Sequence, residues 1–232
     1  MWYGGLVLQP FARKKGSLFR ELSFGLDYFR FRQENLINRL TAAQILANPA
    51  FANLVVRNAP TPGETVGTIS GVLTTWQNLS TGEYEGYDMN ARWILPENKW
   101  GNFRMELSGT YIAEANFTSA TGAIVDTDGE YGSPHFRGSA TVAWNKGNWA
   151  ASVLTTYIGA YNDAFQIAQI SDQYVVNPQV SYKGWFKSTI TLGARNILDS
   201  TPPIDLSDSK LVNENTNWVE PLFVYVRVSK DW

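Results

Sequence analysis

The 232-residue sequence contains no cysteine and a single histidine, His135. Without cysteine there is no disulfide framework and no thiolate metal site, and one histidine is too little for a histidine-based metal or catalytic cluster. The 21 acidic and 19 basic residues nearly balance, so the basic excess that attracts proteins to nucleic acid is also missing. We therefore expect no metal or cofactor, no nucleic-acid partner and no enzymatic activity.

Long apolar runs are absent as well. No stretch approaches the roughly 20 apolar residues that a membrane-spanning helix requires. Aromatic residues, in contrast, are plentiful, with 9 Trp, 11 Tyr and 12 Phe, or 14% of the chain. Many rings without long apolar runs favour alternating strands with interfacial aromatics over apolar helices.

The segment 103–117, FRMELSGTYIAEANF, alternates apolar and polar residues with a period of two, which predicts a strand with one apolar and one polar side. The same alternation, complete or partial, recurs in residues 2–8, 22–28, 87–95, 136–144, 149–157, 176–182, 189–195 and 222–232. We count nine antiparallel strands and predict an all-β chain over residues 1–232.

Two local departures from this pattern carry predictions of their own. The alternation that begins at Leu22 stops at Phe29 and Phe31, which indicates a β-bulge. Within a long link, residues 42–47 read as a short helix that Thr41 would cap and Pro49 would end.

The links between the strands alternate strictly in length. The turns near Arg13, Asn98, Lys146 and Gly184 are short, whereas segments 34–68, 119–133, 161–172 and 199–217 are long. The short-turn end of the predicted strands collects the tryptophans at 93, 100, 144, 149, 185 and 232. Such asymmetry, with an apolar face and a ring of aromatics, is typical of the antiparallel transmembrane barrels of bacterial outer membranes.

A second set of rings lies near the long links. Its members are Phe117, Tyr131, Tyr157, Tyr161, Phe165 and Trp218. They would serve either as an outer aromatic girdle or as an external binding surface. The girdle is favoured, because every such barrel needs interfacial rings.

The polar side of the strands carries most of the charged residues. The candidates for lumen-facing or plug-contact roles are Asp27, Asp88, Arg92, Arg104, Glu106, Glu114, Arg195 and Arg227. In a receptor barrel they would either hold a plug domain by ion pairs or form a general hydrated wall.

The chain ends within a strand. Val224, Val226 and Val228 alternate with polar residues, and Trp232 is the last residue. A last strand that closes a barrel cannot leave a polar tail in hydrocarbon. This ending resembles the C-terminal signal recognised by the machinery that assembles outer-membrane barrels.

Residues 190–203, ITLGARNILDSTPP, are similar to the penultimate barrel strand of TonB-dependent receptors, which reads much like LTLGVNNLFDxxPP. The matched residues are Gly193, Asn196, Leu198, Asp199, Pro202 and Pro203. Residues 78–96 and 22–37 resemble two further strands of that family, in the same order along the chain. Ser80 departs from the glycine that is usual in the first of these.

The resemblance implies that residues 1–232 are the C-terminal part of a 22-stranded outer-membrane barrel, without its plug domain. Because nine strands are too few and odd in number, we expect a fragment. The family implies active uptake of a scarce nutrient, such as a siderophore, cobalamin or an oligosaccharide. It also implies four partners, namely outer-membrane lipid, the barrel-assembly machinery, the TonB system acting through the missing plug, and an external ligand.

Two other classes of protein compete with this interpretation. A soluble β-sandwich that binds carbohydrate through its aromatics would pack its apolar faces against each other, and it leaves the tryptophan cluster and the alternating link lengths unexplained. A small outer-membrane enzyme would need an even strand count and a catalytic cluster, and the sequence offers neither.

Overall fold

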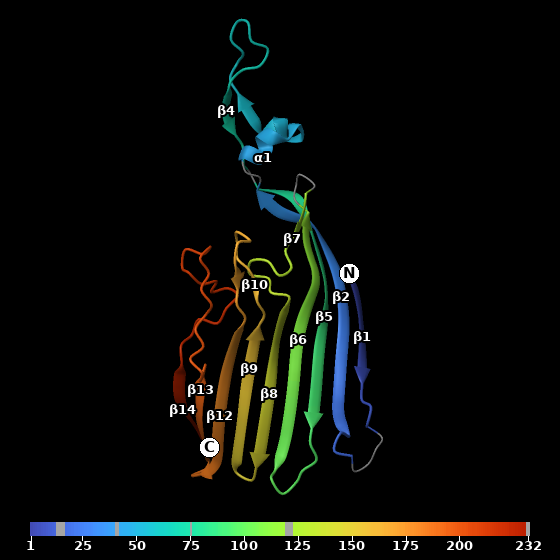
Figure 1. The fold of residues 1–232 in the computed structure, drawn as a ribbon, viewed down its shortest axis with the longest axis vertical. Helices are drawn as coiled ribbons and strands as arrows, with labels where there is room; N and C mark the ends of the chain where they lie inside the picture. Colours follow the sequence, from blue (N-terminus) through green and yellow to red (C-terminus); the bar gives the residue numbers. More distant parts are fainter. Residues whose placement is uncertain (13–16, 40–41, 75, 119–122, 231–232) are drawn as a thin grey trace. The chain divides into compact units, whose positions relative to one another are not determined.

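An antiparallel β-sheet dominates the computed structural model, which describes residues 1–12, 17–39, 42–74, 76–118 and 123–230 (Figure 1). The elements are β1 (Trp2–Leu8), β2 (Glu21–Arg39), α1 (Ala42–Ala47), the 3-10 helix η1 (Pro49–Leu54), β3 (Val55–Arg57), β4 (Ile69–Val72), β5 (Trp76–Ile94), β6 (Asn102–Thr118), β7 (Ile124–Asp126), β8 (Phe136–Lys146), β9 (Trp149–Ile158), β10 (Tyr161–Asn162), β11 (Gln169–Ile170), β12 (Gln173–Trp185), β13 (Ser188–Arg195) and β14 (Phe223–Lys230).

The strands of the main sheet follow the order β1-β2-β5-β6-β8-β9-β12-β13-β14, with β7 paired to β6 off this path. The path therefore contains the nine strands that the sequence predicts, each hydrogen-bonded to its neighbour along the chain. Short links join β5 to β6, β8 to β9 and β12 to β13 on one side, the turn side. Long links leave from the other side, the loop side. Among the described residues the sheet runs from β1 to β14 without closing.

The contacts divide the chain into two compact units. Unit 1 comprises residues 1–30, 85–114 and 127–232 and holds most of the sheet. Unit 2 comprises residues 31–84 and 115–126. It holds the outer parts of three strands, β7, the hairpin of β3 and β4, and the predicted helix, which is α1 with the bounds expected from the sequence. Thr41, its expected cap, lies outside the described residues.

The strand registers sort the side chains of unit 1 onto two faces. The apolar face carries, from β2 to β14, Leu26, Met89, Leu107, Val142, Val153, Val180, Leu192 and Val226. The polar face carries Asp27, Asp88, Glu106, Thr141, Asn177, Gln179, Thr191 and Arg227. The period-two alternation of the sequence predicts this division strand by strand.

The apolar face has no layer packed over it in the described part of the chain. Leu107 is 56% exposed, Leu192 50% and Val226 67%. A soluble β-sandwich would bury such residues against a second sheet, yet the two further sheets formed by the described residues have two strands each. The predicted alternative of a β-sandwich is therefore wrong.

Tryptophans on the turn side bind neighbouring links through their indole N–H groups. Trp93 Nε1 donates to the carbonyl of Leu18 at 3.0 Å, and Trp144 Nε1 donates to the carbonyl of Trp100 at 2.7 Å. An apolar ring with a satisfied polar edge is suited to a boundary between hydrocarbon and water. The side chain of Trp185 and all of Trp232 lie outside the described residues.

The bulge expected at Phe29 is absent from the pairing of β1 with β2. The pairing of β1 with β2 runs without a shift from Trp2↔Arg30 to Leu8↔Phe24. Instead, the ring of Phe29 occupies the space over Gly86, where a Cβ atom would lie 2.7 Å from the ring. A glycine on the neighbouring strand therefore allows this aromatic side chain to occupy the polar face.

No helix among the described residues is both long and apolar enough to span a membrane.

Candidate functional site

The polar face between β5 and β6 holds a shared ion pair. Glu106 Oε1 lies 3.3 Å from Arg92 Nε and 3.5 Å from Arg104 Nε, with all three side chains about half exposed. Surface pairs of this kind contribute about 0–1 kcal/mol each, so they order the wall more than they stabilise it.

Two acidic candidates beside this pair are held by close neighbours. Asp88 Oδ1 accepts a 2.5 Å hydrogen bond from the Thr110 hydroxyl. The carboxylate of Asp27 lies against the backbone of Gly5 on β1, where a Cβ atom would clash with it. Glu114 lies further along the polar side of β6. The structure therefore brings the predicted charges of β2, β5 and β6 together on one wall.

Arg195 and Arg227 form a separate group at the β14 end of the sheet. Arg195 Nη1 lies 3.3 Å from Glu220 Oε2, and its guanidinium also lies 5.9 Å from the centre of the Phe223 ring. Arg227 lies over the Tyr225 ring at 5.8 Å. The predicted charged residues thus share one face but do not form a single cluster.

Between these two charged groups the polar face carries hydroxyl and amide side chains. Ser108 and Ser139 share a hydrogen bond of 2.9 Å, and Ser181 and Thr191 share one of 2.8 Å. Gln179 Nε2 donates to Ser152 Oγ at 3.0 Å. Their polar atoms pair with each other across strands, which makes this part of the wall hydrated and uncharged.

In the parts of the chain that the structure describes, no group of three or more His, Cys, Asp or Glu side chains could hold a metal ion. The arrangement of the polar face is that of a hydrogen-bonding wall. Its arginines and carboxylates can pair with a charged surface laid against it.

Asn196 is the first residue after β13. It is fully buried and adopts a left-handed conformation with φ of 50°. Its Nδ2 donates to the carbonyls of Ser200 at 3.0 Å and Glu220 at 3.1 Å, and its Oδ1 accepts from the Ser200 amide at 2.8 Å. The side chain therefore ties the start of the loop to the residues that lead into β14.

Asp199 completes this attachment. Its Oδ1 accepts a 3.1 Å hydrogen bond from the amide of Leu222, immediately before β14. Gly193 gives space to the Tyr225 ring, because a Cβ there would lie 2.5 Å from it. Leu198 is 68% exposed, and Pro202 and Pro203 lie half-buried in the same loop. Asn196 and Asp199 of the predicted motif thus position the last strand.

A loop cluster that sequence reasoning missed lies on the loop side of unit 1. The Tyr161 hydroxyl donates to Asn217 Oδ1 at 2.6 Å. Gln173 accepts from the Trp218 amide at 2.8 Å and donates to the Trp218 carbonyl at 2.9 Å. Burial, followed by the nearby charge of Asp205, raises the pKa of Tyr161 to about 12. The only sequence signal for these contacts is the amide-rich run NENTNW at residues 213–218.

A second contact joins two loops of this cluster. The Tyr131 hydroxyl donates to Asp208 Oδ2 at 2.8 Å. This hydrogen bond is the main cause that raises the pKa of Tyr131 to about 12. The pKa of the Asp208 carboxyl is lowered, first by the backbone amide of Lys210 and then by the Tyr131 hydroxyl.

The predicted outer girdle is therefore partly wrong. Tyr161 is 1% exposed and Trp218 is half-buried, so both are loop-packing residues. Tyr157 does lie on the apolar face, with its ring 4.7 Å from that of Tyr174 and 5.9 Å from that of Phe136. Tyr28 and Tyr87 form another pair at 5.6 Å. The sequence alone could not separate rings in the loops from rings at the ends of the strands.

The predicted terminal pattern is placed only in part. Val224, Val226 and Val228 lie on the apolar face of β14, between 58% and 67% exposed. Trp232, the final aromatic of that pattern, lies outside the described residues.

A single antiparallel sheet with one exposed apolar face, one hydrated face, and links of alternating length defines the wall of an outer-membrane-type β-barrel. The sequence of residues 13–197 matches the family described as TonB dependent receptor-like, beta-barrel. The chain belongs to this family. Its members are transport receptors of Gram-negative outer membranes, which bind external ligands and interact with TonB.

Solved structures share this fold. The ferric enterobactin receptor of Pseudomonas aeruginosa, in a mutant form, aligns with a TM-score of 0.57 at 16% identity, covering 89% of this chain and 28% of that one. A second mutant of that receptor, in complex with enterobactin, aligns at 0.56 and 14% identity, with the same shares of the two chains covered. The ferric enterobactin receptor in complex with BCV-L6 aligns at 0.57 and 15%, covering 89% and 29%. No curated protein sequence matches this one.

The chain spans a little over a quarter of the length of these receptors. At such identity the likeness shows the fold alone. The predicted family and fold class, an all-β antiparallel barrel segment, are confirmed.

Proposed function

We propose that residues 1–232 form the C-terminal part of the barrel wall of an outer-membrane receptor for the active, TonB-dependent uptake of a scarce nutrient. The observation that carries the proposal is the division of the sheet into an exposed apolar face and a hydrated polar face in a chain of this family. The apolar face would contact outer-membrane lipid, and the polar face would line the lumen.

Each group of side chains has a proposed role within this wall. Glu106 and the two arginines that pair with it, together with Asp27 and Asp88, are proposed to contact the plug. The TonB system would act through this plug. Val224, Val226, Val228 and Trp232 are proposed to present the last strand to the barrel-assembly machinery. The loop cluster would form part of the external surface. The role is transport, and we assign no catalytic step to the chain.

The substrate class that we propose first is a siderophore, since the solved relatives are ferric enterobactin receptors. Cobalamin and oligosaccharides remain the other members of the predicted class. No residue of the described polar face distinguishes them.

The experiment follows uptake in cells that carry the protein as it occurs, with whatever chain flanks residues 1–232. Radiolabelled ferric enterobactin, cobalamin and a maltooligosaccharide are offered to cells with and without the gene, each with and without functional TonB. We expect accumulation of one probe that requires both the gene and TonB.

Two outcomes contradict the proposal. Fractionation that leaves the protein outside the outer membrane would remove the barrel assignment. A protein in the outer membrane whose loss changes the uptake of none of the three probes would remove the proposed substrate class.

A further inference from the structure

The turn between β5 and β6 is held against the end of β8 on the turn side of unit 1. Lys146 Nζ donates to the carbonyl of Lys99 at 2.9 Å, and Trp144 Nε1 donates to the carbonyl of Trp100 at 2.7 Å. Trp144 and Lys146 share the apolar side of β8 with Val142, because residues two apart on a strand point to the same face. The two hydrogen bonds therefore place this turn at the turn-side edge of the apolar face.

The turn owes its position to a glycine and an asparagine. Gly101 has φ of 109°, and a Cβ atom there would lie 2.3 Å from the carbonyl oxygen of Asn145, so the close approach to β8 requires glycine. The carbonyl of Asn98 accepts from the Gly101 amide at 2.9 Å, and Asn98 Oδ1 accepts from the Trp100 amide at 2.8 Å. The backbone that carries Lys99 and Trp100 is thus fixed by the fold of the turn itself.

Lys99, Trp100, Trp144 and Lys146 together form what we call the turn-side basic site. Its two ammonium groups form no ion pair with any described residue, and Glu97 in the same turn pairs with neither of them. The Lys99 ammonium lies 5.3 Å from the centre of the Trp100 ring, and Lys146 uses one of its three N–H donors on the turn. The remaining donors are available to an external anion.

The Trp100 side chain adds a neutral donor to this site. It is 66% exposed, and none of the described residues accepts a hydrogen bond from its Nε1. An indole N–H group is a donor only, and such a group at a membrane interface pairs with an oxygen of the lipid or of water. The site therefore presents N–H donors of three side chains, those of Lys99, Lys146 and Trp100, and no acceptor from a carboxylate.

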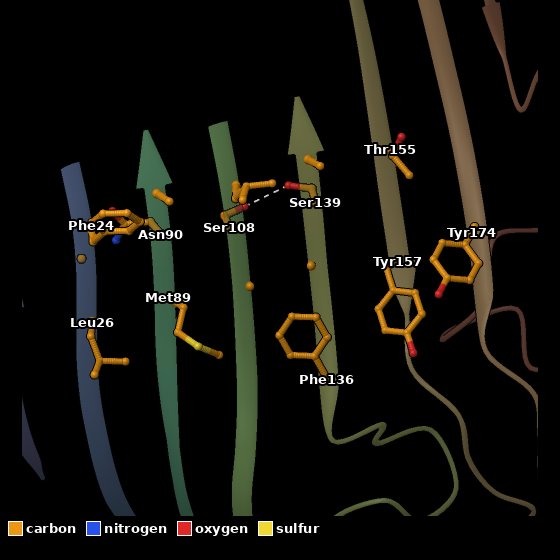
Figure 2. Close-up of a pocket in the computed structure, with 16 residues that line it drawn as sticks. Phe24, Leu26, Met89, Asn90, Ser108, Phe136, Ser139, Thr155, Tyr157 and Tyr174 are labelled. Carbon is orange, nitrogen blue, oxygen red and sulfur yellow. Dashed lines mark hydrogen bonds between the residues drawn. The ribbon is translucent and has the colours of Figure 1, made fainter. Parts of the chain in front are cut away.

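Hydrocarbon-binding surface begins directly beside these donors. Phe103, Met105 and Val142 follow on the apolar side of β6 and β8. Figure 2 shows the part of the same face nearer the loop side, where Met89 and Phe136 lie on β5 and β8. None of these residues is charged. An anion that carries its own acyl chains fits both the donors and this surface, whereas a free inorganic anion would use only the donors.

The charge of the site selects the type of headgroup. A phosphatidylethanolamine headgroup brings an ammonium group beside two lysines, and like charges at such distances repel. A phosphatidylglycerol headgroup carries the same phosphate diester with a neutral glycerol, so it gains the attraction without the repulsion. Lysines near an anionic lipid surface favour its binding.

We propose that the turn-side basic site binds the phosphate of one phosphatidylglycerol molecule of the membrane, whose acyl chains lie along the apolar side of β6 and β8. This inference rests on the proposed function, because it requires the apolar face to lie in a membrane. It goes further in assigning a lipid of one charge type to particular residues.

The test compares the wild type with Lys99→Gln, Lys146→Gln and the double variant. Each protein, as it occurs in the cell, is extracted in a mild uncharged detergent and titrated with palmitoyl-oleoyl phosphatidylglycerol, and native mass spectrometry counts the retained lipid. We expect each single variant to bind the first lipid about fivefold more weakly and the double variant about 25-fold more weakly. The matched control is Lys187→Gln in the exposed turn between β12 and β13, which removes the same charge outside the site and should match the wild type.

Two further titrations identify the source of the phosphate. Palmitoyl-oleoyl phosphatidylethanolamine should bind the wild type more weakly than phosphatidylglycerol, and inorganic phosphate should not displace the bound lipid. Equal affinities for the two lipids, or displacement by inorganic phosphate, would overturn the inference. So would equal retention of phosphatidylglycerol by the wild type and the double variant. Heat-modifiable migration in gels checks that each barrel is folded.

Failure of the inference is distinguishable from failure of the proposed function. A wild-type protein that fractionates away from the outer membrane overturns both. If it fractionates with the outer membrane and the double variant retains phosphatidylglycerol normally, only the lipid site is wrong. If the lipid titrations succeed and none of the three nutrient probes is taken up, only the proposed transport is wrong.

Discussion

Replacing Asn196 by alanine should destabilise the protein by removing the attachment between the loop after β13 and the start of β14. The side chain is fully buried and makes three hydrogen bonds, two to Ser200 and one to Glu220. In Asn196→Ala the Ser200 amide, its carbonyl and the Glu220 carbonyl all lose this partner. A buried polar group without a hydrogen-bond partner costs about 1–3 kcal/mol. Because this loop is partly exposed, we expect each of the three groups to cost about 1 kcal/mol, the lower end of that range.

The backbone adds a second term. Asn196 has φ of 50°, and an alanine in the left-handed region costs roughly 1–2 kcal/mol. The three lost partners, at about 1 kcal/mol each, and this conformational cost give a total expected loss of roughly 4–5 kcal/mol. Asn196→Gly removes the same three hydrogen bonds without the conformational cost, so it should be about 1 kcal/mol more stable than the alanine variant.

Urea unfolding in lipid vesicles, followed by tryptophan fluorescence, measures these differences for the protein as it occurs. The matched control is Asn215→Ala in the same loop region, whose side chain is exposed. A loss below about 0.5 kcal/mol for Asn196→Ala, the range of ordinary surface substitutions, would refute the reasoning. Equal losses for the alanine and glycine variants would refute the conformational part of it.

Three further predictions follow from the site. Substituting Glu106 by Gln should lower stability by less than about 1 kcal/mol, because Arg92 and Arg104 remain half exposed, and a double-mutant cycle with Arg92→Gln measures the coupling. The Tyr131 pKa is raised above its unfolded value of 10.0 to about 12, so its contribution is fully present below pH 10 and is lost as the pH rises through 12. Unfolding between pH 8 and 12 tests this, and Tyr131→Phe should be less sensitive over that range. Gly193→Leu should displace the Tyr225 ring and loosen the pairing of β13 with β14, which faster amide hydrogen exchange in β14 would reveal, whereas unchanged exchange would contradict it.

Much of the fold was predictable because a strand has a period of two. The alternation in residues 103–117 predicts the face on which Leu107 and Glu106 lie, and the register of β6 against β8 confirms it. The helix at 42–47 was predictable for a similar local reason, namely a good helix-forming segment that ends before a proline. Phe29 shows the limit of local reasoning, because the space that its ring fills on the polar face is provided by a glycine on another strand.

The candidate site was less predictable. That Glu106 on β6 pairs with Arg92 on β5 depends on the register between these two strands, which no single strand specifies. Tyr161 looked like a girdle residue, yet it hydrogen-bonds to Asn217, 56 residues later in the chain. Composition and spacing carry no information about which loop meets which.

By itself, the sequence determined the architecture and the polarity of its two faces. The alternation of side chains, the lengths of the turns and the motif after β13 are local properties of the sequence. The alternation directly assigns each residue to one of the two faces of the sheet. The tertiary structure alone decided which loops lock together and which charges pair across strands. These features depend on the register between strands, which arises only when residues distant in the sequence are placed side by side.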